Sequence, residues 1–143
     1  MKCDRARALV CKDKKILVIH RYRDGCEYYV LPGGHVEEGE TKETTVIREL
    51  KEETSVSVIL VELIHSLIDV DGSTHYVYKC DYVSGEPRLG EGSEERLRMT
   101  KENIYEPMWL DIVELPELVF WPVATKDFLM NYFNVFQVLY RKK

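Results

Sequence analysis

The sequence lacks the features that mark several classes of protein. Only four of its 143 residues are cysteine, and the absence of a C-x-x-C pair argues against a zinc site or disulfide framework at Cys3, Cys11, Cys26 and Cys80. No apolar run approaches the roughly 20 residues that a membrane-spanning helix needs, and the charged residues 1–5 do not resemble a signal peptide. Basic residues are also in deficit, because 20 Lys and Arg against 25 Asp and Glu give a net charge of −5. Since nucleic acids and anionic membranes attract basic surfaces, we predict a cytoplasmic protein that binds neither.

What is present is the material for one folded domain. Hydrophobic residues make up 45% of the chain and charged residues 31%, which is enough apolar side chain for a sizeable core and enough charge for solubility. A chain of this length lies close to the commonest domain size. We therefore expect a single domain over residues 1–143.

The hydrophobic pattern predicts a mixture of strands and helices. Alternating or β-rich stretches predict strands at residues 5–12, 15–20, 27–31, 56–70, 74–83 and 104–112. The first two are expected to form a hairpin, and Pro32, Gly33 and Gly34 to end the third strand. Helical spacing predicts helices at residues 41–54 and 125–140, and the polar residues 84–103 predict a mobile loop or a short helix. Together they indicate an α+β fold, a mixed sheet with helices on both sides.

The first predicted helix carries a cluster of acidic side chains. At about 100° per residue, Glu49, Glu52 and Glu53 fall on one face, with Glu53 at the border of the buried side. Carboxylates held this close repel one another unless a cation joins them, and a hard divalent ion is the natural partner. The alternative is a solvated helix face with ion pairs such as Arg48 with Glu52.

The surroundings of this cluster favour the first interpretation. Gly34 is followed after five residues by Glu40, and then after seven by Arg48-Glu49-Leu50, one further residue and Glu52-Glu53. This spacing resembles the Nudix box, G-x5-E-x7-R-E-U-x-E-E-x-G-U, in which U is aliphatic, and every fixed acidic and basic position is matched.

The resemblance implies a fold and a reaction. The fold is an α/β/α sandwich around a mixed β-sheet, of α+β class. The reaction is the hydrolysis of a diphosphate bond in a nucleoside diphosphate linked to another group, by water attack on phosphorus. The cofactor would be Mg²⁺, with Mn²⁺ as the alternative ion, and the partner a small-molecule nucleotide.

The resemblance also implies roles for particular residues. Metal ligands would be Glu52, Glu53, Glu49 and the carbonyl of Gly34, and Glu49 could instead act as the general base. Arg48 would orient Glu49 and would itself be braced by Glu40. A further acidic ligand from a later segment is expected at Glu106, whereas we interpret Glu94, Glu95 and Glu102 as solvated charges.

One position departs from the box. Ser55 stands where the pattern has glycine, just beyond the predicted end of the helix. Glycine there serves a left-handed C-cap, and serine in that conformation costs on the order of 1 kcal/mol without removing a ligand. We therefore expect a local structural change and retained catalysis.

Several residues outside the box are candidates for binding the substrate. Arginine can contact phosphates and an aromatic ring can stack on a base, which nominates Arg21, Arg23, Tyr28, Tyr29, Phe120 and Trp121. A nucleoside triphosphate, including an oxidised one, is the expected substrate, since no proline or tyrosine 15–18 residues beyond the box supports ADP-ribose or a dinucleoside polyphosphate. The alternatives are a catalytically silent nucleotide-binding module and, compatible with either, a homodimer formed through the C-terminal helix.

Overall fold

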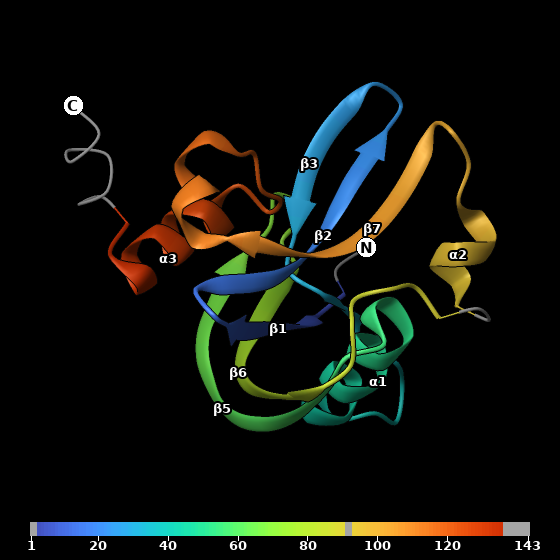
Figure 1. Ribbon diagram of the computed structural model, residues 1–143. Helices are drawn as coiled ribbons and strands as arrows, with labels where there is room; N and C mark the ends of the chain where they lie inside the picture. The colour runs from blue at the N-terminus through green and yellow to red at the C-terminus, as the bar shows by residue number, and fades with distance from the viewer. Residues whose placement is uncertain (1–2, 91–92, 136–143) are drawn as a thin grey trace.

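The fold is organised around one seven-stranded mixed sheet, shown in Figure 1. The computed structural model describes residues 3–90 and 93–135. The strands are β1 (Arg5–Lys12), β2 (Lys15–Arg23), β3 (Cys26–Val30), β4 (Gly33–His35), β5 (Ser57–Ile68), β6 (Thr74–Ser84) and β7 (Asn103–Asp111). The helices are α1 (Lys42–Thr54), α2 (Glu94–Arg98) and α3 (Ala124–Phe133), with a 3-10 turn, η1, at Ile112–Glu117.

The strands follow the order β3-β2-β1-β6-β5, with β4 added beside β1 and β7 beside β2. The pair β1 and β6 is parallel, whereas β2 runs antiparallel to β1, β3 and β7. The predicted hairpin of β1 and β2 is confirmed. The strands β5 and β6 form a long antiparallel hairpin, which curves around one end of the molecule (Figure 1).

The two longer helices cover opposite faces of the sheet, as Figure 1 shows. On one face, α1 packs Val46 and Leu50 against the small side chain of Ala8. On the other, Leu129 of α3 belongs to the same buried cluster as Leu9, which alternates with Ala8 along β1. Successive residues of a strand point to opposite faces, so β1 contributes to both cores. The expected α+β sandwich is confirmed.

The third strand ends before Pro32, as predicted, but Gly33 and Gly34 then belong to a short strand, β4, which the sequence did not predict. Gly33 pairs with Arg7, and Gly34 with Ala6. Gly33 has a φ of +148°, and a Cβ there would collide with the carbonyl oxygen of Ala6. Only glycine allows this approach of β4 to β1, and the approach brings the backbone of β4 beneath α1.

Helix α1 begins and ends as the sequence predicts. The Thr41 side chain caps the N-terminus by accepting the amide N–H of Thr44 at 3.1 Å. Ser55 lies in the left-handed region at φ 62° and its N–H donates to the Lys51 carbonyl, which confirms the expected C-cap conformation. The Ser55 hydroxyl also donates to the carbonyl of Arg88 at 2.7 Å, a bond that glycine could not form.

The segment between β6 and α2 is held against the end of α1. The amide of Arg88 donates to the Thr54 carbonyl and that of Gly90 to the Glu52 carbonyl, each at 2.9 Å. These two carbonyls have no partner within the helix. The predicted short polar helix is present as α2, capped by Ser93, and its position next to α1 follows from this docking.

Helix α3 is shorter than predicted. It ends at Phe133, and Asn134 adopts a left-handed conformation with φ 57° that terminates the regular turn. The remainder of the predicted helix, residues 136–140, lies outside the described residues. Within the part of the chain that the structure describes, no helix is long and apolar enough to cross a bilayer.

Candidate active site

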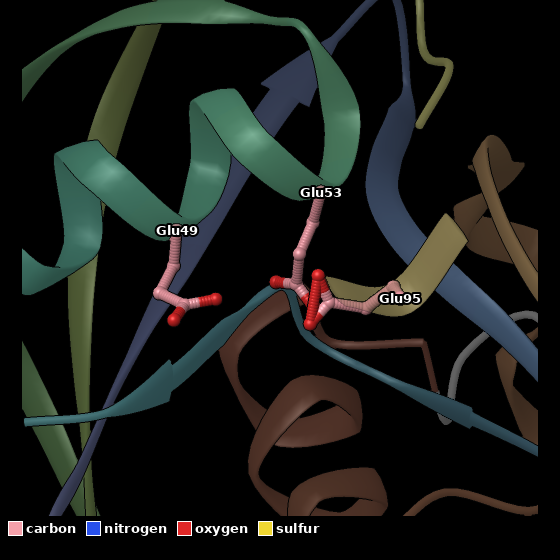
Figure 2. Close-up of side chains that lie close together, drawn as sticks. All are labelled: Glu49, Glu53 and Glu95. Carbon is pink, nitrogen blue, oxygen red and sulfur yellow. The ribbon is translucent and has the colours of Figure 1, made fainter. Parts of the chain in front are cut away.

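Three glutamate side chains meet beside the C-terminal half of α1. One carboxylate oxygen from each of Glu49, Glu53 and Glu95 lies within 4.8 Å of the other two. Figure 2 shows Glu49 and Glu53 projecting from the same side of α1, one turn apart, with Glu95 reaching toward Glu53. Over residues 3–90 and 93–135, no other three His, Cys, Asp or Glu side chains lie close enough together to share an ion.

Glu53 is the most buried member of this glutamate cluster. Its side chain accepts the amide N–H of Gly33 at 2.7 Å, and the residue is 7% exposed. Burial raises the pKa of Glu53 well above its ordinary value, and the neighbouring Glu49 raises it further. Arg7 and the Gly33 amide act in the opposite direction but do not cancel the effect of burial. Glu53 therefore holds a proton readily unless a cation is bound.

Glu49 lies directly over the backbone of Gly34. A Cβ at Gly34 would come within 2.6 Å of the Glu49 carboxyl carbon, so the box glycine creates the space that this carboxylate occupies. Burial raises the pKa of Glu49 to about 7, against the lowering effect of Arg48. Since Arg48 Nη1 donates to Glu49 Oε1 at 3.0 Å, Oε2 is the oxygen left for other chemistry.

The structure corrects the interpretation of Glu95 as a solvated charge. Its Oε1 is buried and has no hydrogen-bond partner among the described residues. A buried carboxylate oxygen without a partner is costly, and here it faces two further carboxylates. Oxygen ligands of this kind suit a hard divalent ion, so the residues of the cluster fit such an ion. Local sequence indicates only that Ser93 caps a short helix, and does not place Glu95 beside α1.

Arg48 and Glu40 brace the cluster, in the contacts that the sequence predicts. Arg48 Nε donates to Glu40 Oε2 at 2.7 Å and Arg48 Nη2 to Glu40 Oε1 at 3.0 Å, a paired geometry that fixes the guanidinium plane. The hydrogen bond from Arg48 is the main reason that the pKa of Glu40 falls to about 2. The Thr45 hydroxyl also donates to Glu40 Oε1, at 2.9 Å. These contacts hold Arg48 in one orientation, in which its Nη1 reaches Glu49 Oε1.

Two of the predicted metal ligands lie outside the cluster. Glu52 Oε2 lies 3.4 Å from Arg48 Nη1. The residue lines an adjoining cleft together with Glu49 and Glu95. Glu106 is on β7, where its Oε1 lies 3.0 Å from His20 Nδ1. Its strand position directs it to His20, so the structure brings Glu95, and not Glu106, to Glu49 and Glu53.

The cluster opens into one cavity, which adjoins a second. The first, of about 370 Å³, is lined by the three glutamates and by four arginines: Arg5, Arg7, Arg21 and Arg98. The second, of about 560 Å³, shares with it Arg5, Arg7, Tyr28 and Val30. Cationic side chains thus face the acidic cluster across a space large enough for a nucleotide-sized ligand.

Four of the proposed substrate-binding residues line these cavities, namely Arg21, Arg23, Trp121 and Tyr28. Arg21 lines the first cavity, where its Cζ lies 3.7 Å from the centre of the Tyr105 ring. Its Nη2 donates to Asn103 Oδ1 at 2.9 Å. Arg23 and Trp121 line the second, and Trp121 is 42% exposed.

The structure corrects the predictions for Phe120 and Tyr29. Phe120 is 2% exposed within the core beneath α3, and Tyr29 packs against the same core and stacks on His20. Neither ring lines the two cavities. Tyr28 points to the opposite side of β3 from Tyr29 and lines both cavities, 6.4 Å from the Trp121 ring centre.

Known proteins resemble this chain in sequence. The chain matches the sequence profile of the NUDIX domain over residues 1–127. It is 35% identical over 120 residues to an ADP-ribose pyrophosphatase of Methanocaldococcus jannaschii, covering 78% of this chain and 63% of that protein. A relative from Caenorhabditis elegans is 34% identical over 93 residues, 64% of this chain and 25% of that protein. The chain therefore spans less than two thirds of the length of these relatives.

A solved structure shows the same fold. The MutT structure, from work on the Aliivibrio salmonicida and Vibrio cholerae proteins, is similar with a TM-score of 0.69 and 19% sequence identity. The similarity covers 92% of this chain and 99% of that chain.

Proposed function

The chain belongs to the Nudix family, and we propose that it is a metal-dependent pyrophosphohydrolase acting as a single domain. It cleaves a diphosphate bond in a nucleoside diphosphate linked to another group, by attack of water on phosphorus. The observation that carries this proposal is the cluster of Glu49, Glu53 and Glu95 at the edge of an arginine-lined cavity.

Glu53 and Glu95 would hold the ion, Mg²⁺ or alternatively Mn²⁺. The unpartnered Oε1 of Glu95 and the raised pKa of Glu53 support this assignment, because a cation would stabilise both carboxylates. Glu52, in the adjoining cleft, and the Gly34 carbonyl are the further ligands that the box implies. A bound ion would neutralise phosphate charge and polarise the phosphorus centre.

Glu49 would take the proton of the attacking water. A general base is most effective when its pKa lies near the working pH, and the pKa of Glu49 is raised to about 7. Arg48 occupies Oε1 and leaves Oε2 for the proton. Glu40 contributes by holding Arg48 in this orientation.

The cavities support a nucleotide as the substrate. Arg21 and Arg23 would contact its phosphates, and Tyr28 and Trp121 would contact the base. We propose a nucleoside triphosphate, including an oxidised one, as the substrate. ADP-ribose is the second candidate, because the relative from Methanocaldococcus jannaschii is named as an ADP-ribose pyrophosphatase.

A hydrolysis screen tests the proposal. The wild-type chain is incubated with nucleoside triphosphates, ADP-ribose, nucleotide sugars and dinucleoside polyphosphates, with Mg²⁺, with Mn²⁺ and with a chelator. Glu53→Gln should abolish the metal-dependent activity, and Glu62→Gln, an exposed carboxylate on β5, should retain it. Nucleotide binding without hydrolysis by the wild type would instead support a catalytically silent binding module.

The proposed homodimer needs its own measurement. Sedimentation of the wild-type chain at several concentrations would show a monomer mass if the C-terminal helix does not join two copies.

A further inference from the structure

A chain of hydrogen bonds leads to Glu53 from the face of the sheet opposite α1. Asp69 Oδ2 lies 3.1 Å from His75 Nε2, and Arg7 Nε donates to His75 Nδ1 at 3.3 Å. Arg7 Nη1 in turn donates to the Gly33 carbonyl at 3.3 Å. The Gly33 amide then donates to Glu53 Oε1 at 2.7 Å. Asp69, His75 and Arg7 are distant from the box in sequence, and the roles proposed above do not use this chain of contacts.

The contacts define the protonation state of His75. A guanidinium can only donate hydrogen bonds, so His75 Nδ1 must accept and the imidazole proton lies on Nε2, where it is donated to Asp69. His75 is 2% exposed, and burial lowers its pKa to about 4, with Arg7 and Arg5 acting in the same direction. His75 is therefore a neutral acceptor that holds Arg7 in one orientation.

Arg7 clamps the backbone that presents the amide to Glu53. Its Nη1 donates to the Leu31 carbonyl at 3.1 Å as well as to the Gly33 carbonyl, so one nitrogen holds both sides of Pro32. Gly33 is in a conformation open only to glycine, and such a residue has wide freedom when it is not held. The Pro32 carbonyl of the same peptide unit accepts the amide of Ala8 at 2.9 Å. The Arg7 clamp fixes the carbonyls on either side of that unit, so its loss should loosen the direction of the Gly33 amide toward Glu53.

We infer that His75 and Asp69 are positioning residues for the metal-binding glutamates and act on Glu53 through Arg7 and the backbone of residues 31–33. This inference rests on the proposed function, because it assigns the network to the metal site of that reaction. Outer partners of metal ligands orient them, and their loss typically weakens metal binding by about 10- to 100-fold.

The decisive variant is His75→Leu. Leucine removes the acceptor for Arg7 Nε and the partner of Asp69 Oδ2, whereas Asp69 Oδ1 keeps the amide of Val70 at 2.7 Å. Arg7 is then free to turn toward the Asp69 carboxylate and leave the Gly33 carbonyl. His75→Gln is the conservative counterpart, because its amide oxygen can accept from Arg7 while its amide nitrogen donates to Asp69.

The measurement is Mn²⁺ affinity without substrate, by electron paramagnetic resonance of the free ion. We expect His75→Leu to weaken Mn²⁺ binding by about 10-fold or more, and His75→Gln to stay within about 3-fold of wild type. His65→Leu is the matched control, since His65 stacks on Phe128 at 4.3 Å between β5 and α3 and contacts none of this network. Thermal unfolding of each variant verifies that the compared proteins are folded.

The outcomes separate the inference from the proposed function. If Glu53→Gln loses Mn²⁺ binding while His75→Leu binds as tightly as wild type, the positioning role is wrong and the metal site stands. Equal weakening in His75→Leu and His75→Gln would also overturn it, because the glutamine preserves both hydrogen bonds. A wild-type chain that binds no Mn²⁺ would overturn the proposed function, and the inference with it.

Discussion

Replacing Glu53 by glutamine should stabilise the metal-free protein and destroy its response to metal. The Glu53 carboxylate is buried and accepts the amide of Gly33, and a glutamine carbonyl oxygen can keep that bond without the charge. The pKa of Glu53 is raised chiefly by burial and then by Glu49. The charged form is therefore unfavourable in the folded, metal-free state, and the variant removes it.

The size of this effect depends on pH in a defined way. A carboxyl whose pKa is raised in the folded state does not lower the free energy of unfolding at a pH below its unfolded pKa of about 4.3. Above it, the cost grows by at most about 1.4 kcal/mol per pH unit until the folded pKa is reached. Between pH 5 and pH 7, the advantage of Glu53→Gln over wild type in free energy of unfolding should therefore grow by up to about 3 kcal/mol.

Metal should reverse the order of stability. An ion at about 100 times its dissociation constant stabilises the wild type by about 2.7 kcal/mol, and the variant lacks a ligand for it. The assay is urea unfolding followed by tryptophan fluorescence at pH 5, 6, 7 and 8, with chelator or with saturating MgCl₂. Glu62→Gln, at an exposed position of β5, should match wild type in both conditions. An advantage of Glu53→Gln that does not grow with pH, or an undiminished response of this variant to Mg²⁺, would refute the reasoning.

Three further substitutions test other parts of the site. Ser55→Gly relieves a left-handed residue but loses the hydrogen bond to Arg88, so thermal and urea unfolding should show a net change within about 1 kcal/mol, whereas Ser55→Ala should be destabilised by about 1 kcal/mol. A loss well beyond this for Ser55→Gly would contradict the C-cap account. Arg48→Lys cannot keep the paired contact with Glu40 and should lower kcat by about 10-fold, and unchanged kcat would argue against its orienting role. Trp121→Ala should raise KM by about 10-fold with little change in kcat, and unchanged KM would place the base elsewhere.

The helix and its charged face could be predicted because the relevant information is local. The spacing of Arg48, Glu49 and Glu53 along one helix determines which side chains share a face. The left-handed position of Ser55 follows from its place just beyond the last turn. The same local reasoning failed for the glycines after β3, because Gly33 is required by an approach to β1 and not by a turn in its own segment.

The substrate side of the site shows the limit of residue type as evidence. Phe120 and Trp121 are adjacent aromatic residues and equally plausible from sequence, yet one is 2% exposed in the core and the other is 42% exposed beside the cavity. Tyr28 and Tyr29 differ in the same way, since neighbouring residues of a strand face opposite sides.

The sequence by itself determined the family, the α+β class and the acidic face of α1, because the box is a continuous segment whose spacing is set by one helix. Only the tertiary structure decided that Glu95, and not Glu106, joins Glu49 and Glu53. It also placed Arg7 against the backbone beside Glu53, and His75 against Arg7. These contacts join segments that are far apart in the chain, and their meeting depends on strand pairing and on the docking of residues 88–90 against α1.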